Sequence, residues 1–414
     1  MLKNPINLFD ITIYHNNCSG GRQILIDLGK RRFLKYLLFA DLYFPQGFSN
    51  MAVPLIALYF IDIEIPIEYI TLIIGIGSIP WIIKFIWSGP IDKYVHKGRK
   101  FFVFIGGLIG AFSFFILYFI DPLNLIILFA IILFFSQIGQ TLLDTAADAW
   151  AIDVSIDKDR GKINAAMNIG KIVGTILGAI VLTFIAQTFG HRYMFIIAGI
   201  MILICVILPS VIAEAKKLIR KQKVRELFLK EFKKKYVKLL LLLIPLAGMG
   251  YGIFNSGIDI YAKNILELSD FQIGLLIASA SAIAIPGSIF AGIISDKFGR
   301  KKAIYLFAIP GAIFVILMIF SDSVTINIII VFLISFFSLG ANAAGLTFYM
   351  DATNPKIGGT QFSFYTGIAN LGMGSAGIIT GSIIVLFGYN YMFLIAGLIC
   401  IPPLILLHFV HIEN

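Results

Sequence analysis

The chain has 414 residues, of which 59% are hydrophobic and only 14% are charged. Soluble globular domains carry about 25% charged residues, so this composition excludes a soluble fold and indicates that much of the protein surface faces lipid. The formal net charge of +10 would indicate a nucleic-acid partner in a soluble protein. In a membrane protein this charge gathers in the loops of one side, so we expect a lipid bilayer and no nucleic acid as partner.

Apolar blocks of about twenty or more residues follow one another along the chain. An α-helix rises about 1.5 Å per residue, so about twenty residues cross a hydrocarbon core about 30 Å thick. The first six blocks are expected at residues 36–60, 68–88, 101–120, 123–152, 162–187 and 191–212. The other six are expected at residues 237–262, 271–293, 303–320, 324–350, 359–387 and 389–410. The sequence therefore predicts an all-α integral membrane protein with twelve transmembrane helices.

The blocks divide the chain into four segments. We expect an N-terminal tail at 1–35, a six-helix bundle at 36–212, a basic linker at 213–236 and a second six-helix bundle at 237–410. The tail lacks the continuous apolar core of a signal peptide and ends in a basic run, so we expect it to stay uncleaved. The linker is the one connection long enough to separate two bundles, and it divides the helices six and six.

Basic residues predict the orientation. If alternate loops lie on opposite sides of the membrane, nearly all of the 33 Lys and Arg residues fall on the side of both termini. Arg192 and Lys263 lie on the opposite side, and Lys84 and Lys171 lie within helices. The positive-inside rule then predicts a multi-pass protein of the cell membrane with both termini and the linker in the cytoplasm. The alternative, an odd number of helices, would scatter the basic loops over both faces.

The two halves of the sequence repeat each other. The segment Phe189–Gly199 recurs as Phe387–Gly397, 198 residues later (387 − 189), and the same shift carries Asp153 onto Asp351. A repeat separated by an even number of membrane crossings keeps its orientation, so the halves are expected to be parallel repeats related by an axis along the membrane normal. This geometry predicts a site between the bundles near the middle of the membrane.

The loop after the eighth block reads G-I-I-S-D-K-F-G-R-K-K from Gly292 and includes Asp296, Gly299 and Arg300. It resembles, at full spacing, the loop signature of the major facilitator superfamily, and a weaker copy follows the second block at Asp92. The resemblance implies a major facilitator fold, and it implies that these five residues form a latch that holds the cytoplasmic side closed. The alternative is a generic basic cytoplasmic loop capped by an aspartate.

Two shorter segments resemble one branch of that superfamily, the muropeptide permeases and acetyl-coenzyme A transporters. One is Asp144–Asp153, and the other is Asn354–Thr360, which continues at Asn370–Gly372 and is similar to the D-P-x-I-G-G-T and N-L-G runs of the acetyl-coenzyme A carriers. Asn354 departs from that pattern, because the branch has an aspartate there. The resemblance therefore leaves the substrate open.

Polar residues inside the fourth and fifth blocks form two stripes. Gln137, Gln140, Asp144 and Asp148 fall within an arc of about 80° of a helix, and Asn164, Asn168, Lys171 and Thr175 fall within about 60°. A lone charge at the bilayer centre costs roughly 2.5–3.5 kcal/mol, so each charge needs a partner or a wet cavity. Since Asp144 and Lys171 have similar depths, we expect them to pair. The alternative is that this pair serves only structure.

The charges of these stripes do not repeat in the second half, which favours a functional role for them. The shift of 198 residues carries the stripes onto uncharged residues, among them Asn342, and Asn255 in the seventh block is a further candidate. Lys84 lies near a helix end, where snorkelling explains it as well as function does. Asp259 lines the cavity in one interpretation and pairs with Lys263 at i,i+4 in the other.

The candidate solute and ion site therefore comprises eight residues: Gln137, Gln140, Asp144, Asp148, Asn168, Lys171, Asn255 and Asn342. The sequence has no phosphate-binding lysine loop, metalloprotease histidine pair or cysteine cluster, so we expect no enzyme, cofactor or metal. We expect a monomeric secondary active transporter that works by alternating access, couples to protons and moves a small or mid-sized solute, with an anionic one compatible with Lys171. The alternatives are a drug-type exporter of the same superfamily and a non-transporting receptor or scaffold on the same fold.

Overall fold

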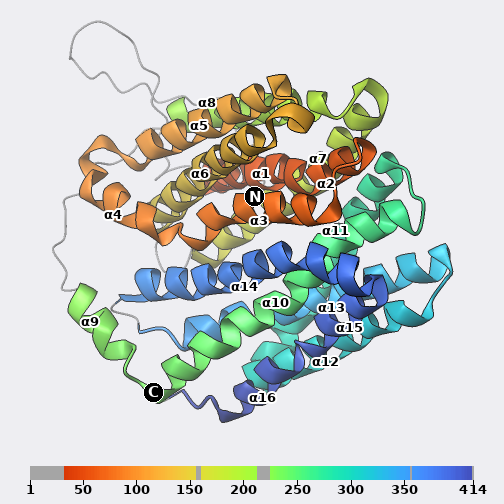
Figure 1. Cartoon of the computed structure of the whole chain (residues 1–414). Coiled ribbons are helices and arrows are strands. Elements are labelled where there is room, and N and C mark those ends of the chain that lie inside the picture. Colours follow the sequence, from red (N-terminus) through yellow and green to blue (C-terminus); the bar gives the residue numbers. More distant parts are fainter. Residues whose placement is uncertain (1–31, 155–159, 212–223, 355–356, 413–414) are drawn as a thin grey trace, which may run out of the picture.

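The computed structural model describes residues 32–154, 160–211, 224–354 and 357–412, and in this part of the chain the regular structure is helical, without strands (Figure 1). Residues 1–31 of the expected tail and residues 212–223 around the expected linker lie outside the described residues. The helices of the N-terminal half are α1 (Arg32–Asn50), α2 (Ala52–Asp62), α3 (Ile67–Ile82), α4 (Phe85–Lys93), α5 (Arg99–Phe119), α6 (Pro122–Val154), α7 (Arg160–Phe189) and α8 (Arg192–Val211), with a 3-10 turn η1 (Val95–Lys97).

A short helix, α9 (Val224–Glu231), precedes the C-terminal half. The helices of that half are α10 (Lys235–Asn264), α11 (Asp270–Phe298), α12 (Arg300–Leu317), α13 (Val324–Asp351), α14 (Gly358–Phe387), α15 (Tyr389–Leu398) and α16 (Ile401–Phe409), with a 3-10 turn η2 (Met318–Phe320). Figure 1 shows α1 to α8 on one side of the molecule and α10 to α16 on the other. The exact division into two bundles and a linker stays a prediction.

Eleven helical segments in the described residues are long and apolar enough to cross a membrane. The twelfth span is the pair Ile67–Ile82 and Phe85–Ile91, which is bent by 41°. The all-α membrane architecture predicted from the apolar blocks is therefore confirmed. Two other spans are also interrupted, and a proline explains each of these two breaks. α1 ends four residues before Pro54 and α15 ends four residues before Pro402, because a proline has no N–H for the carbonyl of the fourth residue before it.

The repeat is visible in the backbone. All described residues with a positive φ fall into three pairs at corresponding turns of the two halves. These pairs are Glu64 (60°) with Glu267 (53°), Gly98 (89°) with Gly299 (96°), and Gly190 (106°) with Gly388 (86°). Gly98 and Gly299 each precede a helix that begins with an arginine, and their φ values lie in a region that residues with a Cβ rarely adopt. The second glycine of each loop motif is thus needed for the turn itself.

Glycines bring α1 and α7 into close contact. A Cβ added at Gly170, Gly174 or Gly178 would run into the α1 backbone at Ala40, Phe44 or Phe48. Because a helix pair can approach this closely only where side chains are absent, the row fixes α7 against α1 along its length. The row therefore also sets the rotation of α7 about its own axis, and with it the directions in which the other faces of α7 point.

The main helix pairs that join the two halves in the described residues are α3 with α14, α7 with α11, α2 with α10 and α4 with α14. We call the end where α1 begins and α16 ends the proximal end, and the opposite end the distal end. Two of the three described hydrogen bonds between α7 or α3 and the other half lie towards the distal end, from Phe271 N to Gln187 Oε1 at 3.0 Å and from Gly381 N to Thr71 Oγ1 at 3.2 Å. The third, from Asn370 Nδ2 to Trp81 O at 3.2 Å, lies further towards the proximal end. Within the described residues, α6 and α13 do not pack closely on each other.

Candidate functional site

Asp144 is the centre of a buried polar cluster that joins three spans. Its side chain on α6 is almost fully buried, and its Oδ2 lies 3.0 Å from Lys84 Nζ. Its Oδ1 accepts a hydrogen bond of 2.8 Å from Gln46 Nε2 on α1. Lys84 precedes α4 in the break of the bent span, and this break lets the side chain reach α6. Snorkelling therefore does not describe Lys84.

The expected pair between Asp144 and Lys171 is wrong. Lys84 takes that place, and no hydrogen bond or ion pair of the Lys171 ammonium occurs among the described residues. Lys171 still interacts electrostatically with Asp144 and Asp148. Matching depths along the helices did not give the contact, because neither depth nor helical periodicity could reveal the break that brings Lys84 to Asp144.

Asp148 lies one turn further along α6 and is half-buried. The Tyr43 hydroxyl on α1 donates a hydrogen bond to Asp148 Oδ1. No cation of the described residues lies within ion-pair distance of Asp148, so its direct partner is a neutral phenol. Sequence reasoning missed both donors from α1, Tyr43 and Gln46. Their spacing of three residues was the available signal, because it places two polar groups on one face of an otherwise apolar block.

Lys171 lies on the face of α7 that points between the two halves. At about 100° per residue, the stripe of Asn168 and Lys171 falls between the glycine row facing α1 and the residues Ala179 and Thr183 facing α11. The opposite face of α7 carries exposed apolar side chains, namely Ile169 (60%), Val173 (41%) and Leu177 (42%). Those residues form the lipid side. Asn168 and Lys171, which are also exposed, therefore face the space between the halves rather than lipid.

The two glutamines of the α6 stripe differ in their surroundings. Gln137 Oε1 accepts a hydrogen bond of 2.8 Å from Trp81 Nε1, so its amide is engaged in packing α3 on α6. Gln140 is 2% exposed, and neither its Oε1 nor its Nε2 has a partner among the described residues. An unpaired buried amide costs about 1–3 kcal/mol. Gln140 is consequently the stronger candidate of the two for a role beyond packing.

The C-terminal candidates lie apart from this cluster. Asn255 on α10 and Asn342 on α13 are exposed, and neither makes a contact with the Asp144 cluster among the described residues. Asn370 on α14 comes nearest, because its Nδ2 donates a hydrogen bond of 3.2 Å to Trp81 O. Asp259 does not pair with Lys263, which turns to other carboxylates instead. The structure thus assembles the charged residues of the first half and leaves the polar residues of the second half separate.

The described contacts of the second loop motif lie within the C-terminal half. The Asp296 side chain is 77% exposed and pairs with Arg300, whose Nε lies 3.1 Å from Asp351 Oδ2. A Cβ at Gly292 would meet nothing within 4 Å. The side chain of Asp92 lies outside the described residues. Because the motif contacts lie within one half, the expected latch stays a prediction.

One group of possible metal ligands occurs among the described residues, at the distal end. Oxygen or nitrogen atoms of Asp62, His191 and Asp270 lie within 4.8 Å of one another. The Lys263 ammonium contacts both carboxylates, 2.8 Å from Asp62 Oδ1 and also against Asp270 Oδ1. A bound cation at this point would be repelled by the ammonium, so the group is better described as an ion network.

Comparisons with known proteins agree with this architecture. The D-xylose-proton symporter superposes with a TM-score of 0.74 at 17% identity, covering 92% of this chain and 98% of that one. A mutant of the nucleoside transporter NupG gives 0.75 at 13% identity, over 90% of this chain and 99% of that one. A bacterial homologue of the human lysosomal transporter Spinster, in an inward-facing and unoccupied conformation, gives 0.71 at 15% identity, over 91% and 95%. These likenesses show a shared fold.

In sequence, the chain is 31% identical to the arabinose-proton symporter of Bacillus subtilis (strain 168) over 132 residues. This stretch covers 31% of the chain and only 28% of the symporter. The sequence model of the family described as Major Facilitator Superfamily matches residues 39–269 and, a second time, residues 240–413. The two matches together cover nearly all of the membrane portion, one for each half. The chain therefore belongs to the Major Facilitator Superfamily and has the all-helical membrane fold of that family.

Proposed function

We propose that the protein is a secondary active transporter that binds a small polar solute and a proton between its two halves and works by alternating access. The observation that carries the proposal is the unequal pairing of four charges at membrane depth. Asp144 and Lys84 form a buried ion pair, whereas Asp148 is held by a phenol and Lys171 is free of direct partners. Charges inside a membrane are costly, so an unpaired acid and an unpaired base that face a shared space indicate function.

Each residue has a distinct role in this proposal. Asp144 and Lys84 neutralise each other and hold α3, α4 and α6 together, so this pair supports the site. Asp148 takes the transported proton, because it has no cation in direct contact. Lys171, on α7 of the same half, binds an anionic group of the solute in the space between the halves. Gln140 and Asn168 add hydrogen bonds.

Coupling follows from the attraction between Asp148 and Lys171. While Asp148 is ionised, its charge and that of Asp144 hold the Lys171 ammonium. Protonation of Asp148 removes one of the two negative charges and leaves Lys171 available for the solute. Proton and anionic solute then bind together, which is the requirement for symport. Two similar proteins, the arabinose-proton symporter and the D-xylose-proton symporter, are proton-coupled by name, which supports proton coupling for this chain.

The solute class has two candidates. Lys171 favours an anionic solute, which agrees with the resemblance to muropeptide permeases and acetyl-coenzyme A transporters. The uncharged amides Gln140 and Asn168 favour a neutral polyhydroxylated solute, which agrees with the sugar and nucleoside transporters named above. We place the anionic solute first, because an ammonium at membrane depth interacts more strongly with a negatively charged group than with a neutral sugar.

We further infer the orientation and organisation of the chain. Both termini and the linker at 213–236 lie in the cytoplasm, so the proximal end faces inward and the distal end faces outward. The membrane is the cell membrane, the protein is a monomer, and the bundles comprise residues 36–212 and 237–410. The conformation described above is open inward. The latch of Asp92, Gly292, Asp296, Gly299 and Arg300 then forms when the proximal end closes.

Uptake into proteoliposomes tests the function. The panel contains an anionic muramyl peptide, an acyl-coenzyme A thioester, arabinose and uridine, each with and without an inward proton gradient. The proposal expects gradient-dependent uptake of an anionic member, and reduced uptake of the same compound by Lys171→Met. Uptake of arabinose that is unaffected by Lys171→Met would favour the neutral solute. Movement of a compound out of the vesicles, against its own concentration gradient, would favour a drug-type exporter. The absence of flux for every compound would favour a receptor or scaffold.

A further inference from the structure

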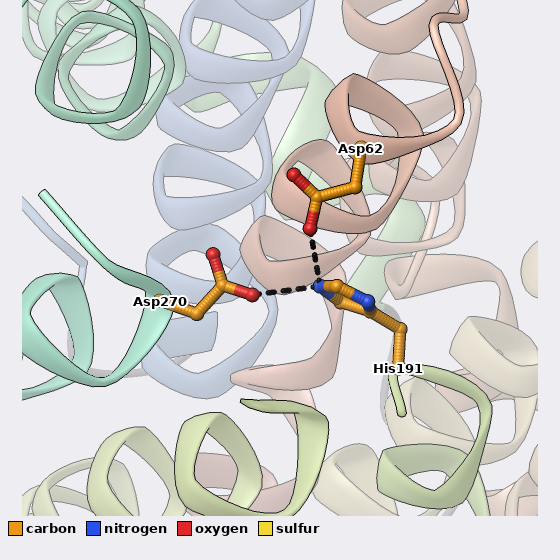
Figure 2. Close-up of side chains that lie close together, drawn as sticks. All are labelled: Asp62, His191 and Asp270. Atoms are coloured by element: carbon orange, nitrogen blue, oxygen red, sulfur yellow. Dashed lines mark hydrogen bonds and ion pairs between the residues drawn. The ribbon is translucent and has the colours of Figure 1, made fainter. Parts of the chain in front are cut away.

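Four charged or titratable side chains meet at the distal end, each from a different helix end or turn. Figure 2 shows three of them, Asp62, His191 and Asp270. Asp62 is the last residue of α2, and His191 lies in the turn between α7 and α8. Asp270 is the first residue of α11, and Lys263 lies one residue before the end of α10. Two of the four therefore belong to the N-terminal half and two to the C-terminal half, with one acid and one base in each.

The contacts form a closed ring of alternating acids and bases. His191 Nε2 lies 2.8 Å from Asp270 Oδ2 and 3.4 Å from Asp62 Oδ2, as Figure 2 shows. Lys263 Nζ lies 2.8 Å from Asp62 Oδ1 and also contacts Asp270 Oδ1. Each carboxylate thus gives one oxygen to the histidine and the other to the lysine. We call these four residues the distal ring.

Two of the four contacts cross between the halves and two stay within one half. His191 with Asp270 and Lys263 with Asp62 are the crossing contacts. His191 with Asp62 and Lys263 with Asp270 remain when the halves separate at this end. We propose that the distal ring is the gate that closes the distal end, and that it opens by giving up its two crossing contacts while each half keeps one acid next to one base.

Exchange of partners keeps the gate reversible. Breaking a buried ion pair is costly mainly when it strands one charge without a partner. In the distal ring no charge is stranded, because every residue has a second partner on its own half. Water screens these contacts only weakly, because three of the four side chains are largely buried. The side chains of Asp270, His191 and Lys263 are 6%, 13% and 17% exposed, and that of Asp62 is 38% exposed.

The surroundings of the ring fit this role. The Tyr59 ring stacks on the His191 imidazole with 5.2 Å between centroids, which holds the imidazole in place. Close packing below the ring joins the same two halves, because a Cβ at Gly274 on α11 would run into Thr183 and Ala179 on α7. The ring therefore closes the distal surface above a tight helix contact.

A matched pair of acids allows a sharp test. Asp121 is 36% exposed at the same end, close to the 38% of Asp62, but its partner Arg192 belongs to the same half. Asp62→Asn weakens a crossing contact, whereas Asp121→Asn weakens a contact within the N-terminal half. Both variants remove one outward-facing negative charge, so general electrostatic effects are equal. The inference rests on alternating access in the proposed function, but on neither the solute nor the coupling ion.

The experiment measures distal distances by pulsed electron paramagnetic resonance. Spin labels at Leu123→Cys and Asp322→Cys, one in each half, are placed in a background without native cysteines and reconstituted without solute. Lys263→Met and Asp62→Asn are expected to raise the population with the longer distance by about tenfold over the unsubstituted labelled protein, and Asp121→Asn is expected to leave it unchanged. His191→Lys, which fixes a positive charge in the ring, is expected to lower that population.

The outcomes separate the gate from the transport cycle. A single distance in every variant would contradict alternating access itself. Two distances whose ratio is the same in Asp62→Asn, Lys263→Met and the unsubstituted protein would overturn the gate while leaving alternating access intact. A melting temperature measured on each labelled sample identifies any variant that fails to fold, and the opposite shift expected for His191→Lys then decides the matter.

Discussion

Asp144 on α6 lies 3.0 Å from the ammonium of Lys84, a residue that stands in the break between two helices of one span. This relationship changes the roles of the charges around it. The pair neutralises Asp144, so within this cluster of described residues Asp148 is an acid without a cation at ion-pair distance, and Lys171 is a base without a direct partner. A site for a proton and a solute needs groups that are free to change partners, and the Asp144–Lys84 pair leaves such groups beside it.

Removal of Lys84 is expected to destabilise the protein. Lys84→Met strands the buried Asp144 carboxylate and should lower the free energy of unfolding by roughly 3–5 kcal/mol, because a buried charge loses its partner. Lys171→Met is the matched control, since that ammonium has no direct partner, and its melting temperature should stay near that of the wild type. The double variant Lys84→Met, Asp144→Asn should recover most of the loss. Equal melting temperatures for Lys84→Met and Lys171→Met would contradict this assignment.

The two arginines after the loop motifs are expected to differ in their contribution to stability. Arg99 Nε lies 3.0 Å from Asp153 Oδ2 and Arg300 Nε lies 3.1 Å from Asp351 Oδ2, so the repeat preserves the pair. The side chain of Arg99 is 8% exposed, compared with 28% for Arg300. Arg99→Met should therefore cost about 2–3 kcal/mol, and Arg300→Met about 1 kcal/mol or less. Thermal unfolding in detergent measures both, and a larger loss for Arg300→Met would refute the reasoning.

The uncharged side chain of Asn354 is expected to stabilise the ionised carboxylate of its neighbour Glu231 on α9. Asn354 Nδ2 donates a hydrogen bond of 2.8 Å to Glu231 Oε1. Burial opposes ionisation of Glu231, but hydrogen bonds from Lys234 and Asn354 hold its pKa below the usual value. The stability that Glu231 contributes is therefore present at neutral pH and is lost as the pH falls through that lowered pKa.

Asn354→Asp, which introduces the aspartate found in the branch that this segment resembles, should place a second carboxylate against Glu231. We expect a loss of roughly 1 kcal/mol at pH 7 and a smaller loss at pH 4, where one carboxyl binds a proton. The variant Asn354→Asp, Glu231→Gln should regain the stability at pH 7. Thermal unfolding at the two pH values checks the sign, and a loss that grows on acidification would be inconsistent with like-charge repulsion.

Substitutions at two glycines are expected to affect different properties, the stability of the protein at Gly174 and the rate of uptake at Gly292. Gly174→Ala should lower stability by about 2 kcal/mol or more, because the added Cβ runs into the α1 backbone at Phe44. Gly292→Ala should leave the melting temperature unchanged, since its Cβ meets nothing within 4 Å. If the latch forms when the proximal end closes, Gly292→Ala should still slow uptake. Normal uptake in Gly292→Ala would remove the support for Gly292 as part of a latch.

The fold followed from features that a linear sequence carries. Hydropathy gave the membrane spans, the basic loops gave their expected orientation, and the Phe189–Gly199 repeat indicated two related halves. Helical periodicity also placed Asp144 and Asp148 on one face of α6. These predictions depend on residues close together in the chain, where 1.5 Å and about 100° per residue are reliable guides.

The partners in the site depended on features that periodicity does not contain. Lys84 reaches Asp144 because its span breaks at that point, and the break has no clear sequence signal. Tyr43 and Gln46 come from α1, whose rotation is set by the glycine row of α7. His191 and Lys263 lie in separate turns, and only the folded chain brings them to the same two carboxylates. Charge and depth could identify candidates, but a pairing needs the rotation and bending of each helix.

Proton-driven accumulation by Asp148→Asn tests the central claim most directly. The assay uses proteoliposomes, an inward proton gradient and the panel compound that the wild type accumulates, together with solute exchange in the absence of a gradient. We expect Asp148→Asn to keep exchange within about threefold of the wild type but to lose accumulation, because the amide cannot carry the proton. Accumulation at the wild-type level in Asp148→Asn, with protein of normal melting temperature, would contradict the assignment of Asp148 as the proton carrier.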